Sequence, residues 1–486
     1  MAPVVHTKLG SLKGEYVSVK GKESGVHAFL GVPFAKPPLG PSLRLAPPQP
    51  VEGWEGVRDA TQQPPMCMQP KNFALALIDK LGVLLADIPD ISEDCLYLNI
   101  YTPAKRANDA KLPVMVWIHG GGLSLGSAST YDGSALAAYQ EAVVVLIQYR
   151  LGLLGFLSTG DEHISGNFGL LDQIEALKWI QQHIHNFGGD PGSITIFGES
   201  AGGVSVSFLL LSPLSVGLFH CAIAESGTAA MDLLVANDPL PMAQVNYPCC
   251  SYFTDFRHFA QDRRLRFPVN VDGHFLTKPV NELFHKHEFL TIPFMAGINN
   301  DEGGWLLKNM GSLRWLQIFY STCQSLKLLM LTEVTFTDFL CTLIKKQVSL
   351  LNITLICLLL DAGAPVYLYE YQHSLNFLQN RRPSFVGCDH TDEIFTVLGF
   401  YVCLEEEEQM SRTMMSYWGN FARTGSPNGD NLVHWPKYGA DEKYLAIGLK
   451  KQVTGQYLKK DRFVFLTQIL PQKIKQHEEN AEHSEL

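Results

Sequence analysis

The sequence predicts an α/β protein in which helices cover a large, mostly parallel sheet. Short apolar runs rich in Val and Ile alternate along the chain with longer stretches whose apolar residues recur at helical spacing. Alternation of this kind is typical of parallel sheets with helices on their faces. The 486 residues are 46% hydrophobic, enough to bury a large core, and no internal repeat or low-complexity linker divides them. We therefore expect one domain over residues 1–486.

The predicted elements follow the chain in a regular order. Residues 1–21 show the alternating pattern of β-strands, interrupted by turns that contain Gly and Lys. Buried strands are expected at 112–120, 142–150, 193–198, 220–227, 293–300 and 365–372. Residues 167–184 have apolar residues at helical spacing and a charged opposite face, which predicts a helix. A second helix is expected from residue 201, directly after a strand.

Charge and hydropathy exclude two classes of partner. The chain has 38 basic and 48 acidic residues, a net charge of −10, and no basic cluster that could neutralise a phosphate backbone. We therefore expect no nucleic-acid partner. The longest apolar stretch, 348–360, is shorter than the roughly 20 residues that a membrane span needs. We therefore expect no transmembrane segment.

The stretch IFGESAGGVSV, residues 196–206, places Ser200 between two glycines. As an isolated match to G-x-S-x-G it is weak, and the serine could simply cap a helix. Its position between a predicted strand and a predicted helix is the context of a nucleophile elbow. In such a turn the serine backbone is strained, and only glycines fit two residues away on either side. The pattern thus predicts Ser200 as a nucleophile with Gly198 and Gly202 beside it.

The motif HGGG at 119–122 follows the strand VMVWI. Glycines at this place allow backbone N–H groups to approach a developing oxyanion. We expect Gly121 and Gly122 to donate two hydrogen bonds and the amide of Ala201, which follows the nucleophile, to donate the third. A plain glycine loop is the alternative reading.

A catalytic histidine should follow the serine, with its acid between them. Of the 16 histidines, His390 in GCDHTDEIF opens an apolar helix, whereas His373 ends a strand and His434 precedes Trp435. Glu302 lies just past a predicted strand, and Asp301 and Asp272 are the alternative acids. Chain order therefore favours Ser200, Glu302 and His390.

These motifs together resemble the type-B carboxylesterases of the α/β-hydrolase fold. The resemblance rests on EDCLYLNIYTP, HGGG, NFGLLDQ, FGGDPGSITIFGESAGG, GINNDEGGW, DHTDE and WGNFARTGSPNG. It covers most of the chain, and the closing stretch 444–486 is most similar to the mammalian carboxylesterase 2 group.

The resemblance implies a serine hydrolase that acts on ester and amide xenobiotics or lipids through an acyl-enzyme intermediate. It implies Ser200 as nucleophile, Glu302 as acid and His390 as base, and requires neither a metal nor an organic cofactor. Cys67 and Cys95 bracket a segment of suitable length for a disulfide, although two buried thiols are the alternative; the resemblance implies that they are bonded.

Two segments depart from the family pattern. Residues 232–272 differ in sequence from the family, which has a longer helical segment there. Residues 308–360 match the family poorly and are shorter, as if part of a helical cap were deleted or altered. The alternative function is accordingly a catalytically impaired or non-catalytic binding protein.

The two ends of the chain point to different compartments. The sequence that starts at residue 1 does not have the pattern of a signal peptide. In contrast, HSEL at 483–486, in the polar tail 472–486, resembles an H-D-E-L retrieval signal. We favour the endoplasmic-reticulum lumen, with a retrieval receptor as partner, and interpret Met1 as an artificial or truncated start.

Overall fold

The computed structural model describes most of the chain. The described residues are 2–70, 89–107, 109–230, 234–236, 238–246, 268–302, 353–380, 382, 386–399, 404–458 and 460.

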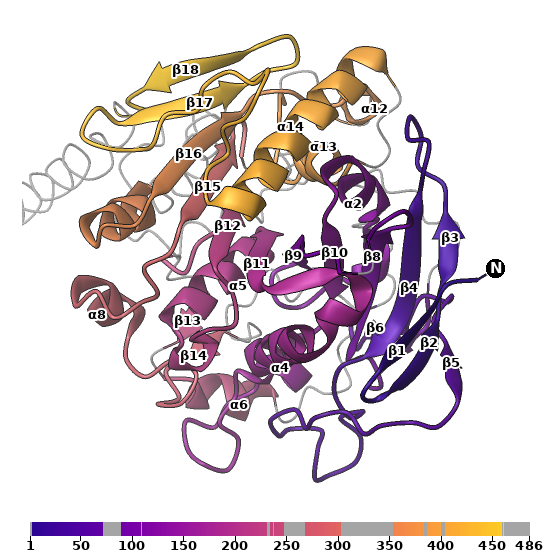
Figure 1. Cartoon of the computed structure of the whole chain (residues 1–486). Coiled ribbons are helices and arrows are strands. Elements are labelled where there is room, and N and C mark those ends of the chain that lie inside the picture. The colour runs from indigo at the N-terminus through magenta and orange to yellow at the C-terminus, as the bar shows by residue number, and fades with distance from the viewer. Residues whose placement is uncertain are drawn as a thin grey trace, which may run out of the picture.

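An eleven-stranded sheet runs through the molecule (Figure 1). Its strand order is β18 (Gln452–Gln456), β17 (Lys443–Ile447), β16 (Val366–Tyr371), β15 (Phe294–Asn299), β12 (Cys221–Glu225), β11 (Gly189–Glu199), β9 (Leu112–Ile118), β10 (Val143–Ile147), β8 (Tyr97–Pro103), β4 (Val26–Pro33) and β3 (Glu15–Val17). All neighbours from β17 to β10 pair in parallel, and the pairs at both edges are antiparallel. The predicted large, mostly parallel sheet is confirmed.

Each of the six buried strands expected from the sequence corresponds to a strand of this sheet: β9, β10, β11, β12, β15 and β16. Their ends differ from the prediction by a few residues. The largest difference is at β11, which begins at Gly189 because this residue already pairs with Leu112 before the register shifts at Ile194. An irregular strand of this kind has no continuous apolar run by which its start could be predicted.

Side chains from alternating positions of the strands build one core on each face of the sheet. In β9, Val114, Val116 and Ile118 belong to one hydrophobic cluster, and Met115 and Trp117 belong to the other. The first cluster is covered by α3 (Gly152–Phe156), α4 (Phe168–His183), α5 (Ala201–Leu211) and α8 (Val280–His285). The second is covered by α2 (Ser134–Gln140), α12 (Asn376–Gln379), α13 (Ile394–Leu398) and α14 (Glu405–Thr424), as Figure 1 shows for α4 and α14. Both predicted helices, α4 and α5, are confirmed.

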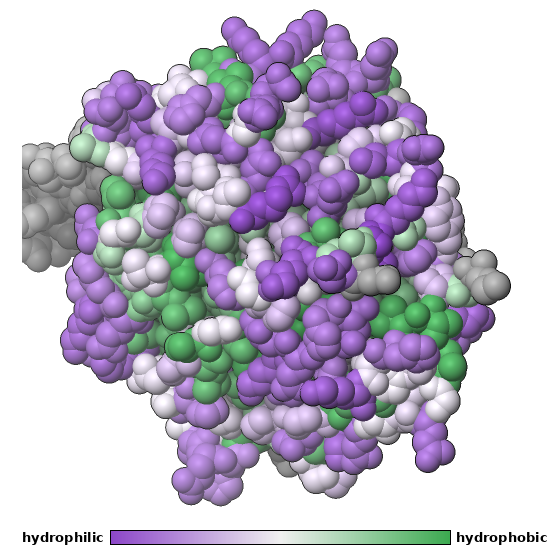
Figure 2. Space-filling model, in the orientation of Figure 1, coloured by the Kyte–Doolittle hydropathy of each residue, from purple (hydrophilic) through white to green (hydrophobic). Residues whose placement is uncertain are grey.

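Smaller elements surround the sheet. They are the three-stranded sheet of β1 (Val4–Thr7), β2 (Gly10–Lys13) and β5 (Val57–Asp59), the pairs β6 (Met66–Cys67) with β7 (Ile91–Ser92) and β13 (Val235–Ala236) with β14 (Val269–Asn270), the helix α6 (Leu240–Asn246), and the 3-10 turns η1 (Ala128–Thr130), η2 (Ile184–Phe187) and η3 (Pro213–Ser215). The expected N-terminal strands are therefore present. Hydrophilic residues cover most of the face shown in Figure 2, and apolar residues gather near α8, β13 and β14.

Much of the two departing segments lies outside the described residues. The residues outside are 308–352 and most of 232–272. The tail 472–486 also lies outside the described residues. Residues 353–360 are described: they are helical, and Leu355, Ile356 and Leu359 are buried in the first core. In the described part of the chain, no helix combines the length and the apolar character that crossing a membrane requires.

Candidate functional site

Ser200 stands in a sharp turn between β11 and α5. Its backbone has φ 57° and ψ −122°, a conformation that costs a residue other than glycine on the order of 1–3 kcal/mol. Its amide donates to the Glu225 carbonyl at 2.8 Å, and its carbonyl accepts from the Val204 amide at 2.9 Å. The strained turn is therefore fixed by the neighbouring strand on one side and by the first turn of α5 on the other.

The two flanking glycines are required by the close approach of β9. A Cβ atom on Gly198 would lie 2.4 Å from the Ile118 carbonyl oxygen, and one on Gly202 would lie 2.0 Å from the same atom. Both distances are far below van der Waals contact. The close approach of β9 therefore confirms the steric reason, expected from the sequence, why only glycine fits at positions 198 and 202.

The HGGG loop lies directly against the nucleophile. A Cβ on Gly120 would come within 3.1 Å of the Ser200 Cβ. Gly121 has φ 105°, and a Cβ there would meet the Leu125 carbonyl oxygen at 2.3 Å. Gly122 has φ 62° and faces open space, because no heavy atom would contact a Cβ at this position. The loop therefore brings side-chain-free backbone to the serine, as the oxyanion-hole prediction requires.

His119 supports the loop rather than titrating in it. Its ring stacks on Tyr149 with centroids 4.4 Å apart, and its Nδ1 donates to the Gly120 carbonyl at 2.9 Å. The Tyr149 hydroxyl donates to the His119 carbonyl at 2.7 Å. Burial lowers the pKa of His119 to about 4. The His119 side chain is therefore uncharged at pH 7 and supports the loop through its hydrogen bond and its ring contact.

Glu302 and His390 come together from distant parts of the chain. The Glu302 Oε2 lies 2.7 Å from His390 Nδ1, and the Asn299 amide donates to Glu302 Oε1 at 3.0 Å. Burial raises the pKa of Glu302, but the charge and the hydrogen bond of His390, together with hydrogen bonds from Ser226 and the Asn299 amide, outweigh burial and leave the pKa below its ordinary value. Glu302 is 1% exposed. It is therefore a buried carboxylate with its charge matched by the imidazole.

The alternative candidates have other partners. His373 lies 3.0 Å from the Glu407 carboxylate on α14. Asp301 accepts from the Gly387 amide, and Asp272 accepts from two amides of its own turn. Of the three candidate acids, the one hydrogen-bonded to His390 in the described structure is Glu302.

Glu199 is a charged group beside the histidine that sequence reasoning missed. Its Oε1 lies 3.1 Å from His390 Nε2, although without hydrogen-bond geometry, and the residue is 2% exposed. Burial lowers the pKa of His390, but Glu199 and Glu302 raise it more strongly, so that it lies well above its ordinary value. Burial in turn raises the pKa of Glu199. The sequence signal that could have revealed it is the position of Glu199, an acidic residue between an apolar strand and Ser200.

Sequence reasoning also missed a second layer of polar groups. Glu393 accepts from the Ser226 hydroxyl at 3.1 Å and from the Asn299 side-chain amide at 2.5 Å. The Asn299 amide group also donates to the Asp389 carbonyl at 2.7 Å, next to His390. Asn299 thus connects the acid loop to the histidine loop. Glu393 was visible in the quoted DHTDE motif, but nothing in the sequence showed that it turns inward.

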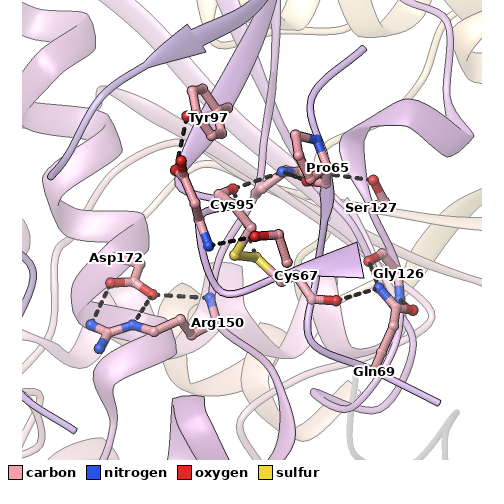
Figure 3. Close-up of a disulfide and its surroundings, with 12 residues drawn as sticks. Pro65, Cys67, Gln69, Cys95, Tyr97, Gly126, Ser127, Arg150 and Asp172 are labelled. Atoms are coloured by element: carbon pink, nitrogen blue, oxygen red, sulfur yellow. Dashed lines mark hydrogen bonds and ion pairs between the residues drawn. A yellow bond between two sulfur atoms is a disulfide. The ribbon is translucent and has the colours of Figure 1, made fainter. Parts of the chain in front are cut away.

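Cys67 and Cys95 form a disulfide, which settles the alternative left open by the sequence. Figure 3 shows its surroundings: the Gln69 side chain donates to the Gly126 carbonyl at 2.8 Å and accepts from the Gly126 amide at 3.0 Å. The Gln148 side-chain amide donates to the Cys95 carbonyl at 2.7 Å. The bridge therefore lies in a network that reaches Gly126, a short distance along the chain from the HGGG motif at 119–122.

Metal-ligating residues do not gather anywhere in the described ranges: no group of three or more His, Cys, Asp or Glu side chains is placed to hold an ion.

Comparison with known proteins places this site in a family. The sequence model of the carboxylesterase family matches residues 1–247 and 250–466. This chain belongs to the carboxylesterase family. The match includes the stretch 308–360, and with the sheet described above it confirms the predicted α/β-hydrolase fold.

Relatives align along the whole chain. The rat protein named pyrethroid hydrolase Ces2e is 43% identical over 541 aligned positions, covering 100% of this chain and 93% of the relative. The human cocaine esterase is 43% identical, with 100% and 95% covered, and the pig liver carboxylesterase is 42% identical, with 100% and 96% covered. The alignment of 541 positions exceeds the 486 residues of the chain, so the relative has residues that this chain lacks. As a member of this family the chain is a carboxylic-ester hydrolase.

Proposed function

We propose that the chain hydrolyses carboxylic esters through an acyl-enzyme intermediate on Ser200, with His390 as general base and Glu302 as its acid. The observation that carries this proposal is the 2.7 Å hydrogen bond between Glu302 and His390, in a site where Ser200 occupies a strained elbow beside the HGGG loop. The chain order Ser, Glu, His is that of α/β-hydrolases.

In the first step, His390 takes the hydroxyl proton of Ser200 as the oxygen attacks the ester carbonyl. Glu302 holds the imidazole by Nδ1 and stabilises its charged form. The amides of Gly121, Gly122 and Ala201 bind the oxyanion, and each such donor contributes about 3 kcal/mol in the transition state. His390 then protonates the leaving alcohol.

Deacylation repeats these roles with water. His390 removes a proton from a water molecule, the resulting hydroxide attacks the acyl carbonyl, and Ser200 leaves as its proton returns from the imidazole. The carboxylic acid is released and the resting enzyme is restored. Apart from the substrate and water, these steps use only groups of this chain.

The names of the relatives support small-molecule esters and amides, including xenobiotics, as substrates. One relative is named pyrethroid hydrolase and another cocaine esterase, and each name gives a small molecule as the compound that is hydrolysed. A series of p-nitrophenyl and alkyl esters with graded acyl and alcohol groups measures which part of the ester the pocket selects.

The same proposal includes residence in the endoplasmic-reticulum lumen, with HSEL read by a retrieval receptor. The buried disulfide between Cys67 and Cys95 supports an oxidising compartment. A chain provided with a secretory leader should remain in the cell with HSEL and be secreted when residues 483–486 are deleted. Equal secretion of both chains would remove the receptor from the proposal.

Ser200→Ala tests the nucleophile. The variant should lose esterase activity and labelling by a fluorophosphonate, because the attacking oxygen is absent, and should keep the unfolding midpoint of the wild-type chain. Turnover equal to wild type would show that Ser200 is not the nucleophile. Peptide mapping of the labelled wild-type chain identifies the residue that reacts.

Two histidine variants assign the base. His390→Ala should lose activity by a factor on the order of 10⁴ or more, since the members of a triad act as a unit. His373→Ala is the control, because His373 pairs with Glu407 instead, and it should retain activity. The reverse pattern would assign the base to His373.

The alternative, a protein that binds esters without turning them over, is separated by a burst assay. An active elbow releases one equivalent of p-nitrophenol per chain even where deacylation is slow. Ligand binding with neither a burst nor steady turnover would favour the binding protein.

A further inference from the structure

A buried hydrogen bond joins the long C-terminal helix to the strand beside the nucleophile. Trp418, on α14, donates its indole Nε1–H to Glu225 Oε1 at 2.8 Å. Glu225 is the last residue of β12, and both side chains are fully buried. The second carboxyl oxygen of Glu225 has no hydrogen-bond partner in the described part of the chain. The indole is thus the donor that satisfies this buried carboxyl group.

Glu225 also holds the nucleophile through its backbone. Its carbonyl accepts the Ser200 amide at 2.8 Å, and it pairs with Glu199 in the register of β11 and β12. The next amide along the strand, that of Ser226, donates to Gly297 on β15 at 2.9 Å. A shift of Glu225 along or out of the sheet therefore moves the carbonyl that accepts the Ser200 amide and helps to fix the strained φ of Ser200. Strained residues persist only where their surroundings over-determine them.

Trp418 itself has a fixed position. Its ring lies 5.3 Å from Tyr369 and 6.2 Å from Trp435, centroid to centroid, within the aromatic part of the second core. Tyr369 in turn lies against Gly297, where a Cβ atom would come within 2.1 Å of the phenol ring. Burial raises the pKa of Glu225 well above its ordinary value, and the nearby Glu393 raises it further. The hydrogen bond is therefore between two groups that packing leaves little freedom to move.

We propose that Trp418 and Glu225 are positioning residues of the esterase: the indole holds the carboxyl group, which holds the β12 carbonyl that sets the backbone of Ser200. This inference rests on the proposed role of Ser200 as the nucleophile. Neither side chain is required to contact substrate, so both act on the rate of acylation rather than on substrate binding. The aromatic end of α14, distant in sequence from the elbow, thereby becomes part of its alignment.

The experiment compares four variants of the full chain in the burst assay, with fluorophosphonate labelling and unfolding midpoints measured in parallel. Trp418→Phe should lower the acylation rate by about tenfold to a hundredfold, because misplacement of a reacting group by about 1 Å has an effect of this size. KM should change little. Glu225→Leu should show the same loss, whereas Glu225→Gln, whose amide oxygen still accepts from the indole, should retain most of the wild-type rate.

Trp435→Phe is the matched control. Trp435 is fully buried in the same aromatic cluster and also donates an indole hydrogen bond, but to the Leu368 carbonyl at 3.0 Å. It should lose stability as Trp418→Phe does and keep its acylation rate. Burst amplitude counts the folded, reactive chains, so that a loss of folded protein is not read as a loss of rate.

The outcomes separate this inference from the proposed function. If the wild-type chain shows neither burst nor labelling at Ser200, the proposed function fails and the positioning role fails with it. If the wild-type chain reacts and the rates of Trp418→Phe and Glu225→Leu match that of Trp435→Phe, the positioning role alone is wrong. Should either of the first two variants not fold, the contrast between Glu225→Gln and the remaining variant decides.

Discussion

At the scale of single residues, Thr391 has a backbone conformation that β-branched residues rarely adopt. Its φ is 78°, in the left-handed region, directly after His390. Its carbonyl accepts the Ile394 amide at 3.3 Å, so the turn that carries the histidine depends on this conformation. Glycine adopts such a φ without steric cost. The chain therefore carries strain next to the proposed base that no described hydrogen bond of the Thr391 side chain offsets.

We expect Thr391→Gly to raise the free energy of unfolding by about 0.5–1 kcal/mol, because the strain relieved exceeds the added freedom of the unfolded chain. Esterase activity should be kept or increased. Thr413→Gly, within α14, is the control and should destabilise by about 1 kcal/mol, since glycine is unfavourable inside a helix. Denaturant unfolding of both variants measures the difference. A destabilised Thr391→Gly would show that the threonine side chain has a packing role that outweighs its strain.

At the scale of elements, the strands and helices that build the site were predictable because each has a local signature. The apolar runs of β9 and β11 and the glycines of the elbow can each be recognised from a few consecutive residues. The order of strands is not local: β9 lies between β11 and β10, and this arrangement depends on pairing between distant segments. The contact of Trp418 with Glu225 joins residues 193 positions apart. Such partners could not be found from periodicity or spacing.

The link between β6 and the segment before β8 gives the prediction at this scale. Replacing Cys67 and Cys95 together by Ala should lower the free energy of unfolding by about 3 to 4 kcal/mol, because the bridge closes a loop with a sequence separation of 28. Cys221→Ala, at a free buried cysteine, is the control and should cost less, since it closes no loop. Denaturant titration measures both. Equal losses would mean that packing of the sulfur atoms, not the cross-link, provides the stability. Peptide mapping without reductant should recover Cys67 and Cys95 bonded.

At the scale of the whole molecule, four glutamates from four parts of the chain lie in a buried region, and three of them, Glu199, Glu302 and Glu393, interact electrostatically with His390. Glu199 and Glu225 end neighbouring strands, Glu302 follows β15, and Glu393 precedes α13, and none of them is more than 2% exposed. Burial raises the pKa of Glu393 to about 7, with Glu302 contributing, and it also raises the pKa of Glu199 and Glu225. The pKa of Glu302 alone is lowered. Most of this cluster therefore binds protons more tightly in the folded than in the unfolded chain.

This imbalance predicts that stability and activity respond to pH in opposite directions. Where a folded pKa exceeds the unfolded one, the stabilisation is complete below the unfolded pKa and is lost as pH rises through the folded pKa. For Glu393 that window runs from its ordinary value near 4.5 to about 7, and the shift corresponds to roughly 3 kcal/mol. The raised pKa of His390 adds a loss above its ordinary value of 6.5, while kcat/KM rises over the same range because the base must be neutral.

We therefore expect the free energy of unfolding to fall between pH 5 and pH 8 while kcat/KM increases. Glu393→Gln should flatten the stability curve by about 3 kcal/mol over this range, because the side chain no longer titrates yet can still accept from Asn299. Glu23→Gln removes a charge of the same sign from an exposed position and should leave the slope unchanged. Denaturant unfolding at several pH values, alongside pH–rate profiles, provides both curves. If wild type and Glu393→Gln lose stability in parallel, the buried cluster is not the source of the pH dependence.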